Sequence, residues 1–175
     1  YYREFFKKFK DFNEIDQWWQ DLKNHAANWL IKKFPEGSCV LSVGCGLGYI
    51  EQKIWKEQQN KIDLHVTDFA SDSLRWIKNI LPEENIHIEM EDEKFPESKY
   101  DIIYFSGVDY ALADHNMVEL LKKYKKFLTE DGHLLLISFS FHDEDNSIKN
   151  LAKELIKSIL HSVNLYTKGQ FWGWE

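Results

Sequence analysis

The sequence has little cysteine and proline and no long hydrophobic run. Its 175 residues include two cysteines, Cys39 and Cys45, and three prolines. The spacing of the cysteines fits no zinc pattern and no second Cys/His pair completes one, so the sequence predicts no metal site. No stretch approaches the ~20 apolar residues that a membrane span needs, and no signal peptide is visible. These absences predict a reduced, cytoplasmic protein with no membrane partner.

Positive charge is not concentrated in any one segment. The formal net charge is −7, and Lys7, Lys8 and Lys10 form only a short cluster. Because a nucleic-acid interface needs a basic patch or stripe, we expect no nucleic acid as a partner. Hydrophobic residues are abundant at 43%, and aromatic residues reach 15%. The chain is long enough to bury a substantial core.

The most informative stretch is a hydrophobic strand that runs into three alternate glycines, Gly44, Gly46 and Gly48. Residues 49–59 follow with a helical pattern, so bare backbone and a helix N-terminus would meet at the end of the strand. This arrangement indicates a nucleotide-type cofactor site. The dinucleotide-binding fingerprint needs its third glycine where Tyr49 stands, and the Gly-Lys-Ser/Thr ending of a phosphate loop is missing.

Strand and helix patterns alternate through most of the chain. The pattern predicts an α/β fold with a doubly wound, mostly parallel sheet and helices on both faces. Asp131 and Gly132 are expected to form a turn. The expected strands are residues 39–43, 61–67, 86–90, 100–106 and 133–141, and the expected helices are 49–59, 71–81, 114–128 and 147–161.

Two segments are expected along the chain. Residues 1–34 are predicted to be helical and aromatic-rich, serving either as a packing helix or as a lid, and residues 35–175 to be the cofactor-binding domain. One helix face in the first segment is expected to carry an apolar stripe, formed by Trp18, Leu22, Ala26, Trp29 and Leu30.

Polar residues follow the predicted strands at their carboxyl ends, where ligands bind in open α/β sheets. Asp68 follows the second strand, about 20 residues after the glycines, and can accept two hydrogen bonds from a ribose. Residues 91–93 follow the third strand and could bind an adenine amino group. Residues 106–108 follow the fourth and allow a close backbone approach.

Five segments, in this order, resemble motifs of the class I S-adenosylmethionine-dependent methyltransferases. They are residues 41–48, 67–77, 91–96, 99–104 and 124–134, and the resemblance covers roughly residues 38–141. The resemblance implies S-adenosylmethionine as the cofactor and S-adenosylhomocysteine as its product. It implies that the cofactor-binding residues are Gly44, Cys45, Gly46, Gly48, Asp68, Phe69, Asp92, Glu93, Ser106 and Gly107.

The chain departs from the family pattern in two places. Ser42 stands where the family usually has an acid that orients the glycine loop, so binding is expected to be weaker unless another acid substitutes. Only residues 163–175 are left to supply the family's last two strands. We therefore expect part of the C-terminal strand pair to be missing.

The function that fits these features is methyl transfer to the oxygen or nitrogen of a small-molecule acceptor by in-line displacement. A hydroxyl acceptor would benefit from a general base, and the candidates are Asp109, Tyr110, His115 and His142. One alternative is a non-catalytic module or partner subunit that binds S-adenosylmethionine or its product. Another is an enzyme that uses NAD or a nucleotide sugar.

Overall fold

The structure is a computed structural model that describes residues 2–88, 99–108 and 114–138. Residues 1–106 and 124–137 belong to one compact unit, and the remaining residues belong to a second unit. Within the first unit, the sheet and the turns at the ends of its strands carry most of the predicted cofactor-binding residues. The second unit contributes Gly107, Val108, Ser138 and most of helix α4 (Asp114–Lys125) to the described residues.

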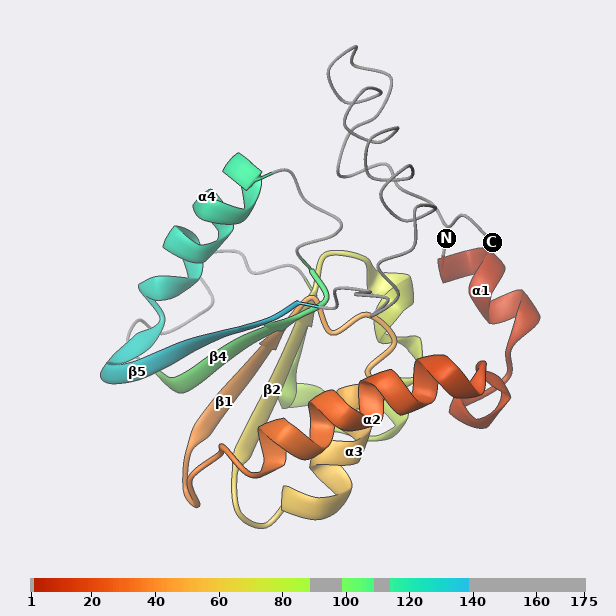
Figure 1. Cartoon of the computed structure of the whole chain (residues 1–175), viewed down its shortest axis with the longest axis horizontal. Coiled ribbons are helices and arrows are strands. Elements are labelled where there is room, and N and C mark those ends of the chain that lie inside the picture. The colour runs from red at the N-terminus through yellow and green to blue at the C-terminus, as the bar shows by residue number, and fades with distance from the viewer. Residues whose placement is uncertain (1, 89–98, 109–113, 139–175) are drawn as a thin grey trace, which may run out of the picture. The chain divides into compact units, whose positions relative to one another are not determined.

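A five-stranded parallel sheet forms the centre of the first unit (Figure 1). Its strands lie in the order β3-β2-β1-β4-β5, and every neighbouring pair is parallel. The chain therefore starts in the middle of the sheet and builds outward in both directions from β1. The strands are β1 (Cys39–Val43), β2 (Asp63–Asp68), β3 (Ile86–Ile88), β4 (Tyr100–Ser106) and β5 (Leu128–Ile137).

The central strands β1 and β4 are buried because their sequences are almost continuously apolar. Val40 and Leu41 of β1 and Ile103 and Phe105 of β4 have no exposed surface. In the register of the pair, Leu41 lies beside Ile103 and Val43 beside Phe105. The core of the unit is therefore centred where the strand order reverses, between β1 and β4.

Two helices lie side by side on one face of this sheet, α2 (Gln17–Ile31) and α3 (Tyr49–Gln58) (Figure 1). Ala26, Ala27 and Leu30 are the buried residues of α2, and Ile54 of α3 is fully buried. The predicted stripe of α2 is therefore only partly right. Its two tryptophans are 56% and 46% exposed, because they lie beside the buried stripe of small and aliphatic residues.

The N-terminal segment is helical but interrupted. Helix α1 (Tyr2–Lys8) is separated from α2 by a short 3-10 turn, η1 (Phe12–Glu14). The Asp11 carboxylate accepts a hydrogen bond from the Asn13 backbone N–H at 2.7 Å. A side chain that bonds its own backbone in this way competes with a continuing helix, so the segment turns here.

The helix predicted over residues 71–81 is wrong. The structure has two 3-10 turns instead, η2 (Ser71–Arg75) and η3 (Ile77–Asn79), and a third, η4 (Glu83–Asn85), precedes β3. Buried Ser73 donates both its backbone N–H (2.9 Å) and its hydroxyl (2.6 Å) to the Ala70 carbonyl. These bonds span three residues, which is the 3-10 spacing.

Asp131 and Gly132 lie within the bounds of β5, but the chain bends sharply at them, as the predicted turn requires. The pairing of β5 with β4 shifts register here: Tyr100 lies beside Leu128, whereas Ile102 lies beside His133. A Cβ built on Gly132 would lie 3.0 Å from the Leu128 Cβ, so the extra residues form a bend between the two paired parts of β5. Helix α4 ends at Lys125 rather than at residue 128.

The structure confirms the predicted α/β fold with a mostly parallel sheet. The helix predicted over residues 147–161 and the C-terminal strand pair lie outside the described residues, as do the ends of the third and fifth predicted strands. Among the residues that the structure does describe, no helix has the length and apolar character to span a membrane.

Candidate functional site

The glycine turn lies at the carboxyl end of β1, beside the point where the strand order reverses. Gly44, Gly46 and Gly48 all have positive φ angles, at 69°, 57° and 77°. Gly48 is the N-cap of α3 in the left-handed conformation, and a Cβ there would lie 2.7 Å from Cδ1 of buried Ile77. Only glycine satisfies both demands, so the backbone of the turn packs directly against the Ile77 side chain.

Asp68, the last residue of β2, holds the glycine turn in place. One carboxylate oxygen accepts a hydrogen bond from the Gly46 N–H at 2.9 Å, and the other accepts one from the Ala70 N–H at 2.9 Å. The Gly44 N–H donates to the carbonyl of neighbouring Thr67 at 2.9 Å. Asp68 is only 4% exposed. Each of its oxygens still has a second lone pair that could accept from a ligand.

Two further residues beside this turn have the surroundings of ligand-binding groups. Phe69 follows Asp68 and is 82% exposed, which is unusual for so large an apolar ring. Ser106 ends β4, and its buried hydroxyl has no hydrogen-bond partner among the described residues. Buried polar groups normally have partners, so both observations fit a bound molecule at this edge. Gly107 follows with a φ of 65°.

Beneath the glycine turn lies a buried acid that the sequence analysis missed, Glu51 of α3. It is 1% exposed, and its Oε1 accepts hydrogen bonds from the Ser42 hydroxyl at 2.6 Å and the Tyr104 hydroxyl at 2.7 Å. The family's usual acid would stand at Ser42, so the carboxylate reaches the same strand from the neighbouring helix. Burial raises the pKa of Glu51, although the two hydroxyl donors act against that shift.

A signal for Glu51 was present in the sequence. It lies next to Ile50 and one turn before Ile54, both of which are buried. A charged residue within the apolar stripe of a helix is a candidate for a paired buried group.

The pKa values of the neighbouring groups follow from the same burial. Burial lowers the pKa of Lys23 to about 8, and the nearby charge of Glu51 acts in the opposite direction. Burial and the charge of Glu51 raise the pKa of Tyr104 well above its usual range, so its hydroxyl remains a donor. Burial likewise raises the pKa of Cys45, so its thiol is protonated near neutral pH.

The N-terminal segment packs over the glycine turn through an aromatic cluster. Leu47 of the turn is buried with Phe12 and Trp76, and rings of α1 pack against this group. The Phe5 ring centroid lies 5.7 Å from that of Trp76. The hydroxyl of Tyr2 would lie 3.4 Å from a Cβ built on Gly46. The start of the chain therefore reaches the backbone that a cofactor would contact.

The structure does not describe the side chains of the other predicted site residues. Asp92, Glu93, Asp109, Tyr110 and His142 fall outside the described residues. His115 belongs to α4, and its side chain is not among those described. The structure therefore brings together Gly44, Cys45, Gly46, Gly48, Asp68, Phe69 and Ser106 on one edge of the sheet.

The fold is that of S-adenosylmethionine-dependent methyltransferases. A methyltransferase of this kind from Archaeoglobus fulgidus superposes with a TM-score of 0.61, at 20% identity, over 90% of this chain and 65% of the other. One from Aquifex aeolicus superposes with a TM-score of 0.54, at 19% identity, over 78% of this chain and 77% of the other.

The family model described as a methyltransferase domain matches residues 14–172. The chain belongs to this family, the class I S-adenosylmethionine-dependent methyltransferases. A curated relative, the phosphoethanolamine N-methyltransferase of Plasmodium falciparum, is 28% identical over 117 residues. That match takes in 63% of this chain and only 42% of the relative's length.

Proposed function

We propose that this chain binds S-adenosylmethionine at the carboxyl edge of its sheet and transfers the methyl group to a small-molecule acceptor. The observation that carries the proposal is the hydrogen bond from the Gly46 N–H to Asp68, which fixes the glycine turn beside the point between β1 and β4 where the strand order reverses. In open α/β sheets this is where ligands bind. The residues at this edge fit the cofactor, because they combine bare backbone, a buried carboxylate and a hydroxyl that has no partner in the described part of the chain.

The proposed roles follow from the chemistry of each group. Asp68 would accept hydrogen bonds from the ribose hydroxyls through its unused lone pairs while it keeps Gly46 in place. The exposed ring of Phe69 would cover one face of the adenine. Ser106 would donate its hydroxyl to the ligand. Asp92 and Glu93 would bind the adenine end, and Gly107 would line the pocket, as the family resemblance implies.

Glu51 would supply the negative charge that Ser42 does not. It lies under the glycine turn and is bonded to Ser42 itself. This arrangement supports a retained cofactor site, while methyl transfer itself is what would separate the enzyme from a non-catalytic module that binds the same cofactor.

When bound, the cofactor supplies the methyl electrophile, and displacement requires an acceptor lone pair in line with it. The chain's contribution is to position the reactants and keep water away. The N-terminal segment 1–34 would serve as the cover, since Tyr2 lies over Gly46. For the acceptor we propose a nitrogen nucleophile, and the curated relative makes phosphoethanolamine the first compound to test. Asp109, Tyr110, His115 and His142 stay candidate bases for an oxygen acceptor.

The test is calorimetric titration of the chain with S-adenosylhomocysteine, in parallel with NAD. We expect S-adenosylhomocysteine to bind and NAD not to. Asp68→Ala should weaken binding by about 1–3 kcal/mol, because a charged acceptor is lost. The matched control is Asp72→Ala, which removes the same charge from a half-exposed residue bridged to Arg3 and should leave binding unchanged.

Two results would contradict the proposal. One is NAD binding without S-adenosylhomocysteine binding. The other is unchanged affinity in an Asp68→Ala protein whose circular dichroism shows a native fold. Methyl transfer to any acceptor in a panel of amines and hydroxyl compounds would separate the enzyme from a module that only binds the cofactor.

A further inference from the structure

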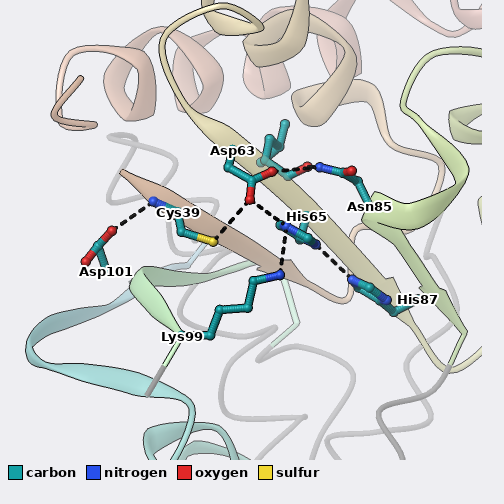
Figure 2. A network of polar contacts seen from close by, with 8 residues as sticks. Cys39, Asp63, His65, Asn85, His87, Lys99 and Asp101 are labelled. Carbon is teal, nitrogen blue, oxygen red and sulfur yellow. Dashed lines mark hydrogen bonds and ion pairs between the residues drawn. The ribbon is translucent and has the colours of Figure 1, made fainter. Parts of the chain in front are cut away.

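The amino edge of the sheet, opposite the glycine turn, carries a cluster of side chains for which the proposed function has no use (Figure 2). Cys39 opens β1 and Asp63 opens β2, and the register of these parallel strands sets the two side by side. His65 lies two residues further along β2, on the same face as Asp63. Three different donor atoms are therefore brought together: a thiol sulfur, a carboxylate oxygen and an imidazole nitrogen.

The distances between these atoms are those of a ligand set. Asp63 Oδ2 lies 3.6 Å from Cys39 Sγ and 3.0 Å from His65 Nε2, and the three ligand atoms all lie within 4.8 Å of one another. In a tetrahedral zinc site, with bonds of about 2.0–2.3 Å, neighbouring ligand atoms lie roughly 3.3–3.7 Å apart. Small side-chain movements would bring all three into this range.

The surrounding groups orient the cluster as they do in known metal sites. His65 Nδ1 lies 2.9 Å from His87 Nε2, so His65 can donate its second ring proton and turn Nε2 toward a metal. The other Asp63 oxygen accepts from the Asn85 amide at 2.9 Å, and the Cys39 backbone N–H donates to Asp101 at 2.8 Å. Asp63 is 56% exposed by its side chain, which leaves a fourth position open to water.

The ammonium group of Lys99 already lies against one of these metal-binding atoms. Lys99 Nζ is 3.1 Å from His65 Nε2. The same Nε2 faces the Asp63 carboxylate, and one nitrogen cannot donate to the acid and accept from the ammonium at once. A metal would resolve this conflict by taking the Nε2 lone pair and the carboxylate together, with the ammonium displaced.

We propose that Cys39, Asp63 and His65 form a binding site for one zinc-type divalent cation. The thiol and imidazole select a borderline-soft metal over Mg²⁺ or Ca²⁺. Binding releases the Cys39 thiol proton to solvent, and water fills the fourth position. Because the Cys39 thiol must lose its proton to bind the ion, binding strengthens as the pH rises. The ion links the starts of β1 and β2 and therefore stabilises the sheet.

The sequence analysis predicted no metal site because the ligands do not share a local spacing. Cys39 and His65 lie on different strands, and only the strand register brings them together.

The test is titration of the metal-free full chain with Co²⁺ under reducing conditions. We expect one equivalent to bind with thiolate-to-cobalt charge-transfer absorption and to be displaced by Zn²⁺. Cys39→Ser should abolish the charge-transfer band, whereas the matched control Cys45→Ser should retain it. His65→Gln should weaken binding by more than about tenfold, and the control His133→Gln should not.

Lys99→Gln is a variant that is expected to fold normally and to raise the affinity for Co²⁺ rather than lower it. It removes the competing ammonium, so Co²⁺ should bind more tightly than to the unaltered chain. The proposal is overturned if the unaltered chain gives no thiolate band at saturating Co²⁺. It is equally overturned if Cys39→Ser keeps the band, or if Lys99→Gln leaves the affinity unchanged. None of these outcomes depends on the binding of S-adenosylmethionine.

Discussion

The two edges of the same sheet both carry polar side chains, but these side chains are bonded to different kinds of partner. At the carboxyl edge, Asp68 bonds the backbone N–H groups of Gly46 and Ala70. At the amino edge, Asp63 bonds other side chains, those of His65 and Asn85. A carboxylate that holds backbone shapes a loop for a ligand, whereas one that holds side chains assembles a cluster of donors.

Glycine is used differently at the two edges as well. Gly37, before β1, has a φ of 85°, and a Cβ built there would meet no atom within 4 Å. Gly48, after β1, has a φ of 77°, and a Cβ built there would collide with the Ile77 side chain. Gly37 is needed only for its backbone conformation. Gly48 is needed for packing as well, because the Ile77 side chain occupies the space where a Cβ would lie.

The largest effect is therefore expected from alanine at these two glycines. Both substitutions place an L residue at positive φ, which costs roughly 1 kcal/mol, with up to about 3 kcal/mol where the backbone is held rigidly. Gly48→Ala adds the contact with Ile77, for a total loss of about 2–4 kcal/mol in the free energy of unfolding. Gly37→Ala is the matched control and should lose about 1 kcal/mol. Urea unfolding measures both.

Equal losses for the two glycine variants would contradict this account. They would mean that the α3 N-terminus moves away from Ile77 at little cost, and that the glycine turn is not fixed by packing.

The next effect concerns Glu51, which accepts from Ser42 and Tyr104. Glu51→Met leaves two buried hydroxyls without this acceptor, and we expect a loss of about 2 kcal/mol. Glu51→Gln keeps a carbonyl acceptor and should lie within about 1 kcal/mol of the unaltered chain. Chemical unfolding of both variants at neutral pH measures the difference. A Met variant as stable as the Gln variant would remove the two hydrogen bonds as a source of stability.

Glu51 also predicts a pH dependence with a definite sign. Burial raises its pKa in the folded chain above the unfolded value, so its favourable contribution is present below the unfolded pKa. That contribution is lost as the pH rises through the folded pKa. Glu51→Gln lacks this loss, and its stability relative to the unaltered chain should therefore improve from acidic to neutral pH.

The sequence predicted the parts of this molecule that depend on continuous local patterns. Strand β4 has the predicted bounds because Ile102, Ile103, Tyr104 and Phe105 form one apolar run. The glycine turn and Asp68 were found because the order of strand, glycines, helix and acid is visible along the chain. The segment around Ser73 was predicted wrongly, because a side-chain hydrogen bond to Ala70 changed the backbone spacing there.

What the sequence could not predict depends on contacts between distant residues. Glu51 meets Tyr104, 53 positions away, only because α3 lies over the junction of β1 and β4. The cluster of Cys39, Asp63 and His65 depends in the same way on strand register. In both cases the residue types are common ones, and their proposed roles depend on contacts with residues that only the fold brings close.

The smallest effect separates the two edges by their response to acid. At the amino edge, burial and the nearby charges of His65 and Lys99 lower the pKa of His87 to about 4. A base with a lowered pKa in the folded chain contributes stability that is full above its unfolded value of about 6.5 and is lost as the pH falls toward 4. His87→Gln removes this pH-dependent contribution, so the variant should lose less stability than the unaltered chain between pH 7 and pH 4.5.

We expect a difference of about 1 kcal/mol after allowing for the solvent that reaches this half-buried ring. Urea unfolding at the two pH values measures it, with the exposed His133→Gln as the control because its ring lies away from the cluster. The amino edge would then be the acid-sensitive end of the sheet, since protons compete there with the pairing of His65 and His87. An identical acid response in His87→Gln and the unaltered chain would contradict this assignment and would place the acid sensitivity elsewhere.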